Sequence, residues 1–130
     1  PLFLILLPLA ADGWYFRRHR KAYRYRNLLL TQPMGYQTSI SLVNRAEKIV
    51  TDSGGVQREA FFAKKPCVTV LDYVGWPETM VNGYNQLARP EKADILEKLS
   101  RPVTFDPAYQ PFGDGHSAEK IVSEIRKFLQ

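Results

Sequence analysis

The sequence contains very little cysteine and histidine. Among its 130 residues there are one cysteine and two histidines. One cysteine cannot form a disulfide within the chain, and these residues are too few for a structural zinc site with Cys and His ligands. Because Cys67 lies in an apolar run, we expect it to be a small core residue that stays reduced, which favours a cytoplasmic location.

Long hydrophobic runs are also missing. The apolar stretch at residues 2–11, interrupted by Pro8, has half of the ~20 residues that a membrane-spanning helix needs. Basic residues follow this stretch, whereas a secretory signal places them before it. We therefore expect a buried strand at Leu2–Leu7 and no membrane association. The alternative is a trimmed membrane anchor.

Excess positive charge is confined to one short segment. The formal net charge is +5, and residues 17–26 contain six Lys and Arg residues and no acid. Residues 27–130 contain 12 of the 18 basic and 12 of the 13 acidic residues, so this part of the chain has no formal net charge. This distribution excludes a nucleic-acid-binding surface spread over the fold. The basic segment is expected to be a solvated tail, and RNA binding through its interleaved tyrosines is the alternative.

The length is that of one ordinary domain. We divide the chain into an atypical segment, residues 1–27, which is apolar and then basic and aromatic, and a domain of residues 28–130. The domain alternates between β-branched or apolar strand patterns and helix patterns with apolar residues three and four positions apart. Strands are predicted at residues 28–30, 48–51 and 67–71, and helices at residues 35–45, 56–65, 93–99 and 117–129.

This alternation predicts an α/β fold, with a mainly parallel, Rossmann-like sheet and flanking helices. Such sheets bind ligands at the carboxyl ends of their strands. The segment Thr51–Ala60 lies at such a place, between a predicted strand and the helix after it. The helix start supplies unpaired N–H groups and a partial positive charge, and Gly54 and Gly55 allow a ligand to approach the backbone. Ser53 adds a hydroxyl, so the segment is a candidate phosphate or diphosphate site.

Glu59 lies four residues after Gly55, on the same face of the predicted helix and roughly 6 Å further along its axis. A carboxylate accepts two hydrogen bonds, which suits the vicinal hydroxyls of a ribose attached to the phosphates. The pattern therefore favours a nucleoside diphosphate. The alternative is purely structural: a tight Gly-Gly turn, an N-cap by Asp52 or Ser53, and a solvated Glu59.

Four ordered stretches resemble the non-hydrolysing UDP-N-acetylglucosamine 2-epimerase family. The first is Val50–Ala60, and the other three are Pro33–Tyr36, Trp76–Thr79 and Pro111–His116. The resemblance covers about residues 27–130 and implies the C-terminal, nucleotide-binding half of a two-domain, glycosyltransferase-B-type fold. It also implies interconversion of UDP-N-acetylglucosamine and UDP-N-acetylmannosamine by elimination and re-addition of UDP, with no metal or redox cofactor.

By this resemblance, Ser53, Gly54 and Gly55 hold the diphosphate and Glu59 holds the ribose. Ser39 occupies the uracil side, where the family usually has an aromatic residue. Trp76 stands where a family arginine contacts the ligand, so a positive contact is missing there or replaced by stacking.

The acid/base carboxylates and the histidine of the family lie in its N-terminal part. We therefore expect no catalytic residue and no metal site in this chain, which would be inactive alone. The expected partners are a UDP-sugar and either a second copy of the chain or a separate N-terminal half. The alternative function is a non-catalytic interaction module that pairs with such a half or binds an anionic polymer through residues 17–26.

Overall fold

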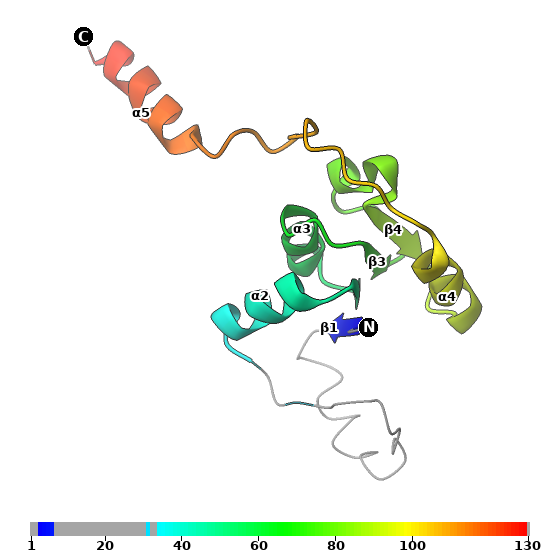
Figure 1. Ribbon diagram of the computed structural model, residues 1–130. Helices are drawn as coiled ribbons and strands as arrows, with labels where there is room; N and C mark the ends of the chain where they lie inside the picture. The colour runs from blue at the N-terminus through cyan, green and yellow to red at the C-terminus, as the bar shows by residue number, and fades with distance from the viewer. Residues whose placement is uncertain (1–2, 7–30, 32–33, 130) are drawn as a thin grey trace.

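The computed structural model describes residues 3–6, 31 and 34–129, and it places four strands in one sheet (Figure 1). The strands are β1 (Phe3–Leu6), β2 (Lys48–Thr51), β3 (Cys67–Val70) and β4 (Asn85–Ala88), and they are neighbours in this order. Every neighbouring pair is parallel. The predicted parallel α/β fold is thus confirmed.

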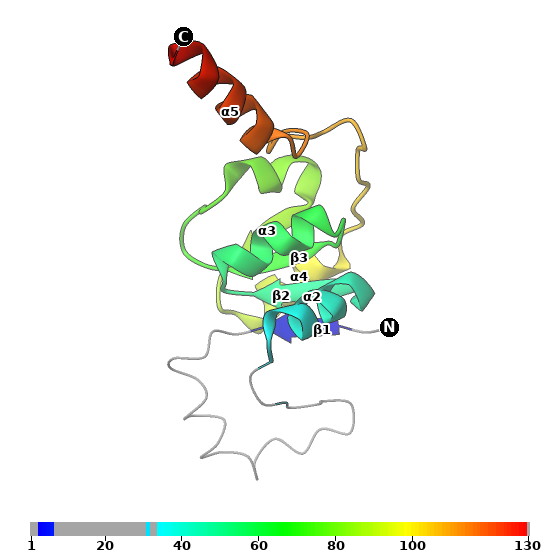
Figure 2. The same cartoon turned by 90° about the vertical axis from the view of Figure 1, so that its left-hand side faces the viewer.

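Helices cover both faces of the sheet (Figures 1 and 2). Helices α2 and α3 lie on one face and α4 lies on the other. The helical elements are α2 (Tyr36–Arg45), α3 (Gly54–Phe62), the 3-10 segment η1 (Pro77–Gly83), α4 (Lys92–Ser100) and α5 (Ser117–Phe128). Because helices cover both faces of the sheet, side chains on both sides of the central strands are buried, and this explains why these strands are short apolar runs in the sequence.

Two small cores follow from the alternation of side chains along β2 and β3. Ile49 and Cys67 point towards α2 and α3, whereas the next residues, Val50 and Val68, point towards α4. Burial on the first face extends to Val43, Ala46 and Ala60, and on the second to Ala88, Ile95 and Leu99. Successive residues of a strand face opposite sides, so one four-residue strand supplies both cores.

Most predicted elements occur where their patterns placed them, with shifted ends. The strand predicted at residues 2–7 is β1 over Phe3–Leu6, and the strand predicted at 28–30 and the basic tract lie outside the described residues. Helix α3 begins at Gly54, two residues earlier than predicted, and ends at Phe62 instead of Lys65. The early end coincides with Lys64, whose φ of 53° is incompatible with a right-handed helix.

The sequence did not predict β4 or η1, because polar and apolar residues are mixed in both segments without a regular strand or helix period. Asn85 and Gln86 are nevertheless buried in β4. The Nδ2 of Asn85 donates to the Gln57 carbonyl oxygen over 3.0 Å, and the Nε2 of Gln86 donates to the Lys98 carbonyl oxygen over 3.1 Å. These hydrogen bonds offset the cost of burying the two amide nitrogens, while the amide oxygens Asn85 Oδ1 and Gln86 Oε1 are buried without a hydrogen-bond partner among the described residues.

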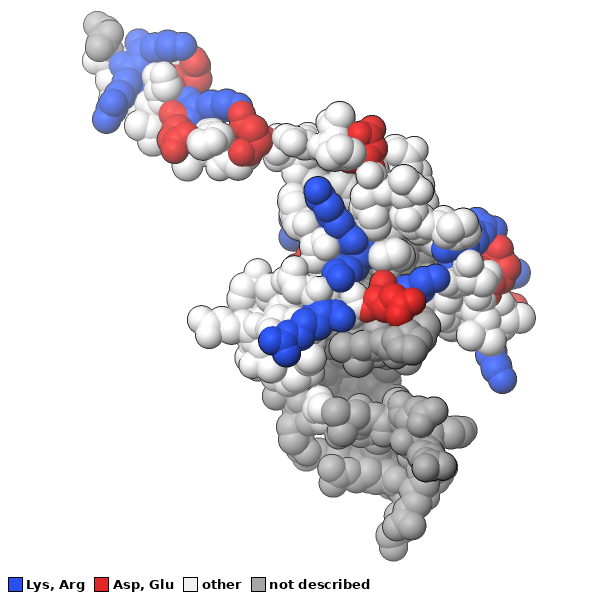
Figure 3. Space-filling view, viewed as in Figure 1, with Lys and Arg blue, Asp and Glu red and all other residues white. Residues whose placement is uncertain are grey.

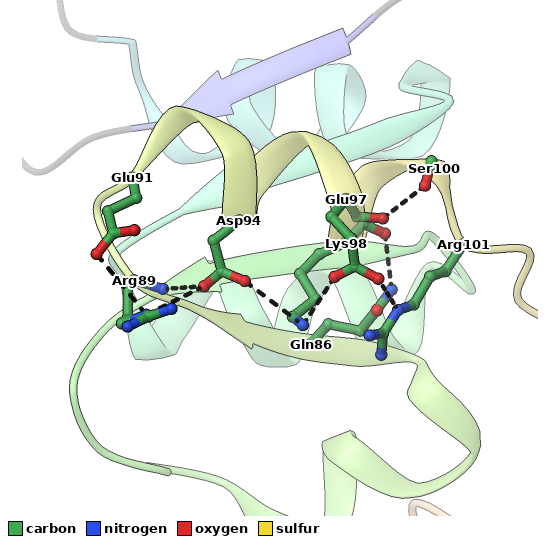
Figure 4. Close-up of polar contacts among 8 residues, drawn as sticks. All are labelled: Gln86, Arg89, Glu91, Asp94, Glu97, Lys98, Ser100 and Arg101. Carbon is green, nitrogen blue, oxygen red and sulfur yellow. Dashed lines mark hydrogen bonds and ion pairs between the residues drawn. The ribbon is translucent and has the colours of Figure 1, made fainter.

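Polar contacts position α4 beside β4 (Figure 4). The backbone N–H of Arg89 donates to Asp94 Oδ2 over 2.8 Å, and this hydrogen bond is the main reason that the pKa of Asp94 lies below its ordinary value. Near the C-terminal end of α4, Glu97 Oε1 lies 2.7 Å from Arg101 Nε. Both ends of α4 are therefore held by side chains of the same β4–α4 unit.

Residues 101–116 have no regular secondary structure and cross the body next to an aromatic cluster. Phe105 stacks on Tyr84 with ring centroids 4.5 Å apart, and Tyr109 donates through its hydroxyl to the Glu78 carbonyl oxygen over 2.9 Å. Gly113 and Gly115, with φ of 83° and 88°, then form a turn before α5. Beyond this turn α5 projects away from the sheet (Figure 1).

Among the described helices, none is both long and apolar enough to cross a lipid bilayer.

Burial of Cys67 gives a testable chemical property. Its side chain is fully buried in the core beside α2 and α3, and this desolvation raises the pKa of the thiol to about 12 from an ordinary 9.0. We expect a disulfide reagent such as 5,5′-dithiobis(2-nitrobenzoate) at pH 8 to leave Cys67 unmodified in the folded chain and to modify it in denaturant. A second thiol introduced at exposed Ser123, as Ser123→Cys, should react at once. Equally fast native labelling at both positions would contradict the buried position of Cys67.

Candidate functional site

The connection between β2 and α3 lies at the carboxyl end of a central strand, as predicted. β2 ends at Thr51, and Ser53 is the extended N-cap residue of α3, with φ of −95° and ψ of 120°. The Ser53 N–H donates to Thr51 Oγ1 over 3.0 Å, and Ser53 Oγ accepts from the Val56 N–H over a long 3.5 Å. The N–H groups of Gly54 and Gly55, the first two helical residues, have no acceptor within the helix.

The two glycines have different surroundings. Gly55 is exposed, and a Cβ there would lie 3.6 Å from Ser53 Oγ, an ordinary contact. A Cβ at Gly54 would lie only 3.3 Å from Nε1 of Trp76. The indole therefore rests on the first residue of α3, and the structure brings together four predicted site residues: Ser53, Gly54, Gly55 and Trp76.

A buried hydrogen-bond network holds Trp76 in this position. Gln57 is 1% exposed, and its Nε2 donates to Thr79 Oγ1 over 2.8 Å. Thr79 Oγ1 in turn donates to the Trp76 carbonyl oxygen, also over 2.8 Å. Sequence reasoning missed Gln57, although its spacing from Ala60 and Phe61 places it on their face of α3, where a polar residue needs a partner.

Arg58 adds a positive charge beside the indole, and the sequence analysis missed it too. Its Cζ lies 4.2 Å from the centroid of the Trp76 ring, which is a cation–π contact. Arg58 is exposed, and within residues 34–129 no carboxylate forms an ion pair with it. The helix start therefore has two sources of positive potential: its own N–H groups and this guanidinium.

The other two predicted residues are less closely tied to the helix start. Glu59 is half-buried in the second turn of α3, and its carboxylate has no hydrogen bond or ion pair among the described residues. Ser39 is half-buried on α2, which packs against α3, but no described contact joins Ser39 to Ser53 or Trp76. Glu59 is thus available to a ligand at the helix start, whereas Ser39 is not assembled with it.

At the helix start Ser53 and Gly54 are half-buried and Gly55 is exposed. Two cavities, of about 420 and 230 Å³, lie elsewhere: one beside β4 and the end of α4, the other among the aromatic residues around Tyr84 and Phe105. On the face seen in Figure 3, basic side chains occur in separate places and form no continuous stripe. Within the described residues, no group of three or more His, Cys, Asp or Glu residues could hold a metal ion.

Comparisons with known proteins agree on one family. The family described as UDP-N-acetylglucosamine 2-epimerase matches residues 5–126. A UDP-N-acetylglucosamine 2-epimerase homolog of Methanococcus maripaludis is 45% identical over 115 residues, which are 85% of this chain and 31% of that protein. The UDP-N-acetylglucosamine 2-epimerase of Methanocaldococcus jannaschii is 37% identical over 98 residues, which are 75% of this chain and 27% of that protein.

Solved structures give the same result. The Methanocaldococcus jannaschii UDP-GlcNAc 2-epimerase in complex with UDP-GlcNAc and UDP has a TM-score of 0.77 and 30% identity. The similarity covers 95% of this chain and 35% of that enzyme. The chain thus spans about a third of the length of its relatives and corresponds to their C-terminal part.

The Gln57 network predicts that replacing glutamine by methionine lowers the free energy of unfolding more at position 57 than at position 37. Gln57→Met keeps a similar side-chain length but removes the donor to Thr79, so the free energy of unfolding should fall by about 1–3 kcal/mol. Gln37→Met, at an exposed position of α2, should change it by less than about 0.5 kcal/mol. Urea denaturation followed by circular dichroism measures both. Equal effects would show that the buried amide does not stabilise the fold.

Proposed function

Because the chain belongs to the UDP-N-acetylglucosamine 2-epimerase family, we propose that it forms the UDP-binding half of an enzyme that interconverts UDP-N-acetylglucosamine and UDP-N-acetylmannosamine. The observation that carries the proposal is the open start of α3, where Ser53, Gly54 and Gly55 follow the carboxyl end of β2. Helix starts of this kind bind phosphate groups through backbone N–H groups and the helix dipole.

Ser53 can contribute to phosphate binding without giving up its role as N-cap. Its Oγ accepts from the Val56 N–H, and a hydroxyl that accepts one hydrogen bond still has its own hydrogen to donate. In the proposed site this hydrogen is donated to a phosphate oxygen, beside the N–H groups of Gly54 and Gly55. These donors stabilise the negative charge that UDP carries when it leaves the sugar.

Glu59 is the proposed ribose ligand. It lies one turn beyond Gly55, and its carboxylate has no partner among the described residues. In this role the carboxylate accepts hydrogen bonds from the two ribose hydroxyls. The chain binds and orients the nucleotide, and proton transfer at the sugar comes from the N-terminal part of the family. We place the protein in the cytoplasm, where the buried Cys67 stays a thiol.

Replacing Glu59 tests the ribose contact directly. Glu59→Gln removes the charge of the acceptor, so binding of UDP should weaken by about tenfold, because hydrogen bonds to a charged group are worth ~1.5–3 kcal/mol. Binding of inorganic diphosphate, which has no ribose, should change little. Isothermal titration calorimetry of the 130-residue chain measures both.

The matched control is Glu47→Gln, which removes an exposed carboxylate between α2 and β2. This variant should bind both ligands as the unsubstituted chain does. Equal losses of UDP and diphosphate in Glu59→Gln would contradict the ribose assignment, and no UDP binding by the unsubstituted chain would contradict the proposed function itself.

The surface of α5 favours a second proposal, that the chain pairs with the N-terminal part of the family fold. Every residue of α5 is exposed. By helical spacing, its apolar side chains fall on one side of the helix and its acidic and basic residues on the other. The exposed apolar residues are Ile121, Val122, Ile125, Phe128 and, just beyond the helix, Leu129. Such a stripe typically marks a surface that is covered in the assembled protein.

The occupant that we propose for this stripe is the N-terminal part of the family. The relatives are about three times as long as the matched region, and this chain corresponds to their C-terminal part. The stripe lies on the last helix of the chain, which projects away from the sheet. A polypeptide that packs on α5 would therefore lie beside the body of the chain.

A chimera tests this pairing. Residues 5–129 replace the matching C-terminal region of the Methanocaldococcus jannaschii enzyme, and Ile125→Asp is introduced into the chimera and into the 130-residue chain. We expect the melting temperature to fall by several degrees in the chimera, because burying a charge against an apolar partner is costly, and to change little in the chain alone. The control is Ser123→Asp, on the opposite side of α5. An unchanged chimera, or a homodimer of the chain that Ile125→Asp dissociates, would contradict the proposed occupant.

A further inference from the structure

We propose that Arg58, held against the face of Trp76, makes the start of α3 select a nucleoside diphosphate over a monophosphate. This inference rests on the proposed function, because it concerns the same UDP site. It adds a contact residue, Arg58, and a positioning residue, Trp76, to the donors of the helix start.

The geometry places the Arg58 guanidinium near the helix start. Arg58 lies four residues after Gly54, so both residues occupy the same face of α3. Side chains of a helix lean towards its N-terminus, which brings the guanidinium back over the first turn. There its Cζ lies 4.2 Å from the centroid of Trp76, whose Nε1 would lie 3.3 Å from a Cβ at Gly54. One continuous set of contacts thus runs from Gly54 through the indole to the guanidinium.

The charge of Arg58 is available to a ligand. No ion pair neutralises it among the residues that the structure describes, and α3 contains no other basic residue. The N–H groups of Gly54 and Gly55 and the Ser53 hydroxyl all belong to the start of α3 and suit one phosphate group. A second phosphate extends beyond these donors. The planar guanidinium, which can form two parallel hydrogen bonds to phosphate oxygens, is the group positioned to bind it.

Trp76 restricts where this charge can be. An arginine on a helix surface samples many rotamers, and contact with an aromatic face reduces this freedom before the ligand binds. The backbone of Trp76 is itself fixed by two hydrogen bonds in series. Its carbonyl oxygen accepts from Thr79 Oγ1, and Thr79 Oγ1 accepts from the buried Gln57 amide. Rigid support of this kind lowers the entropic cost of placing Arg58 against a phosphate.

The test compares UDP and UMP binding to the 130-residue chain by isothermal titration calorimetry. Arg58→Gln should weaken UDP binding by about tenfold and UMP binding by less than about threefold, because UMP lacks the second phosphate. Arg58→Lys keeps the charge but not the planar fork, so it should recover part of the UDP affinity. Arg126→Gln, an equal change of net charge on exposed α5, is the matched control and should bind both nucleotides normally.

Substitutions of Trp76 test the positioning role. Trp76→Phe retains an aromatic face and should cost less UDP affinity than Trp76→Leu. If the two residues act as one unit, Arg58→Gln combined with Trp76→Leu should cost little more than Arg58→Gln alone. Circular dichroism and urea denaturation of each variant establish that it is folded, so that an affinity loss reflects the site.

The possible results separate this inference from the proposed function. Normal UDP binding by Arg58→Gln, or equal losses of UDP and UMP, overturns the role of Arg58 while leaving the UDP site in place. Strictly additive losses for Arg58 and Trp76 overturn the positioning role. An unsubstituted chain that binds neither UDP nor UMP overturns both this inference and the function on which it rests.

Discussion

The hydrogen bond from the buried Gln57 amide to Thr79 determines how the rest of the site is arranged. It joins α3 to η1, and the carbonyl of Gln57 accepts from Asn85 on β4. One polar residue of α3 thus connects to η1 and β4, whose contacting residues lie 22 and 28 positions later in the chain. Because leaving the buried Nε2 of Gln57 without an acceptor would be costly, its hydrogen bond to Thr79 favours this relative placement of α3 and η1. The start of α3, the indole on Gly54 and the guanidinium on the indole all depend on it.

The site combines backbone donors of the helix start with side chains that tertiary contacts place beside it. The helix start follows directly from a buried strand, so the backbone donors are held by the two cores of the sheet. Trp76 precedes η1, and its backbone carbonyl is held by Thr79, which is buried and bonded to Gln57 of α3. Specificity within a shared fold can therefore arise at Trp76 and on the exposed face of α3, where Arg58 lies.

Local patterns were sufficient for the elements whose side chains are apolar and regularly spaced. Strands β2 and β3, and helices α2, α4 and α5, were predicted to within a few residues, and the Gly54–Gly55 segment was placed correctly between a strand and a helix. Strand β4 was missed because Asn85 and Gln86 do not resemble strand residues until their amides find the carbonyls of Gln57 and Lys98. Segment η1 was missed for a similar reason, since Thr79 is buried only through its contacts with Gln57 and Trp76.

The sequence by itself determined the alternation of strands and helices, the glycines at the start of α3 and the amphipathic pattern of α5, because each depends on neighbours within a few positions along the chain. Only the tertiary structure decided that Trp76 lies on Gly54, that Arg58 stacks on Trp76 and that the stripe of α5 has no cover within the described residues. These features involve partners about 20 residues apart or outside the fold, and the free energy that selects them comes from burial and hydrogen bonding between elements.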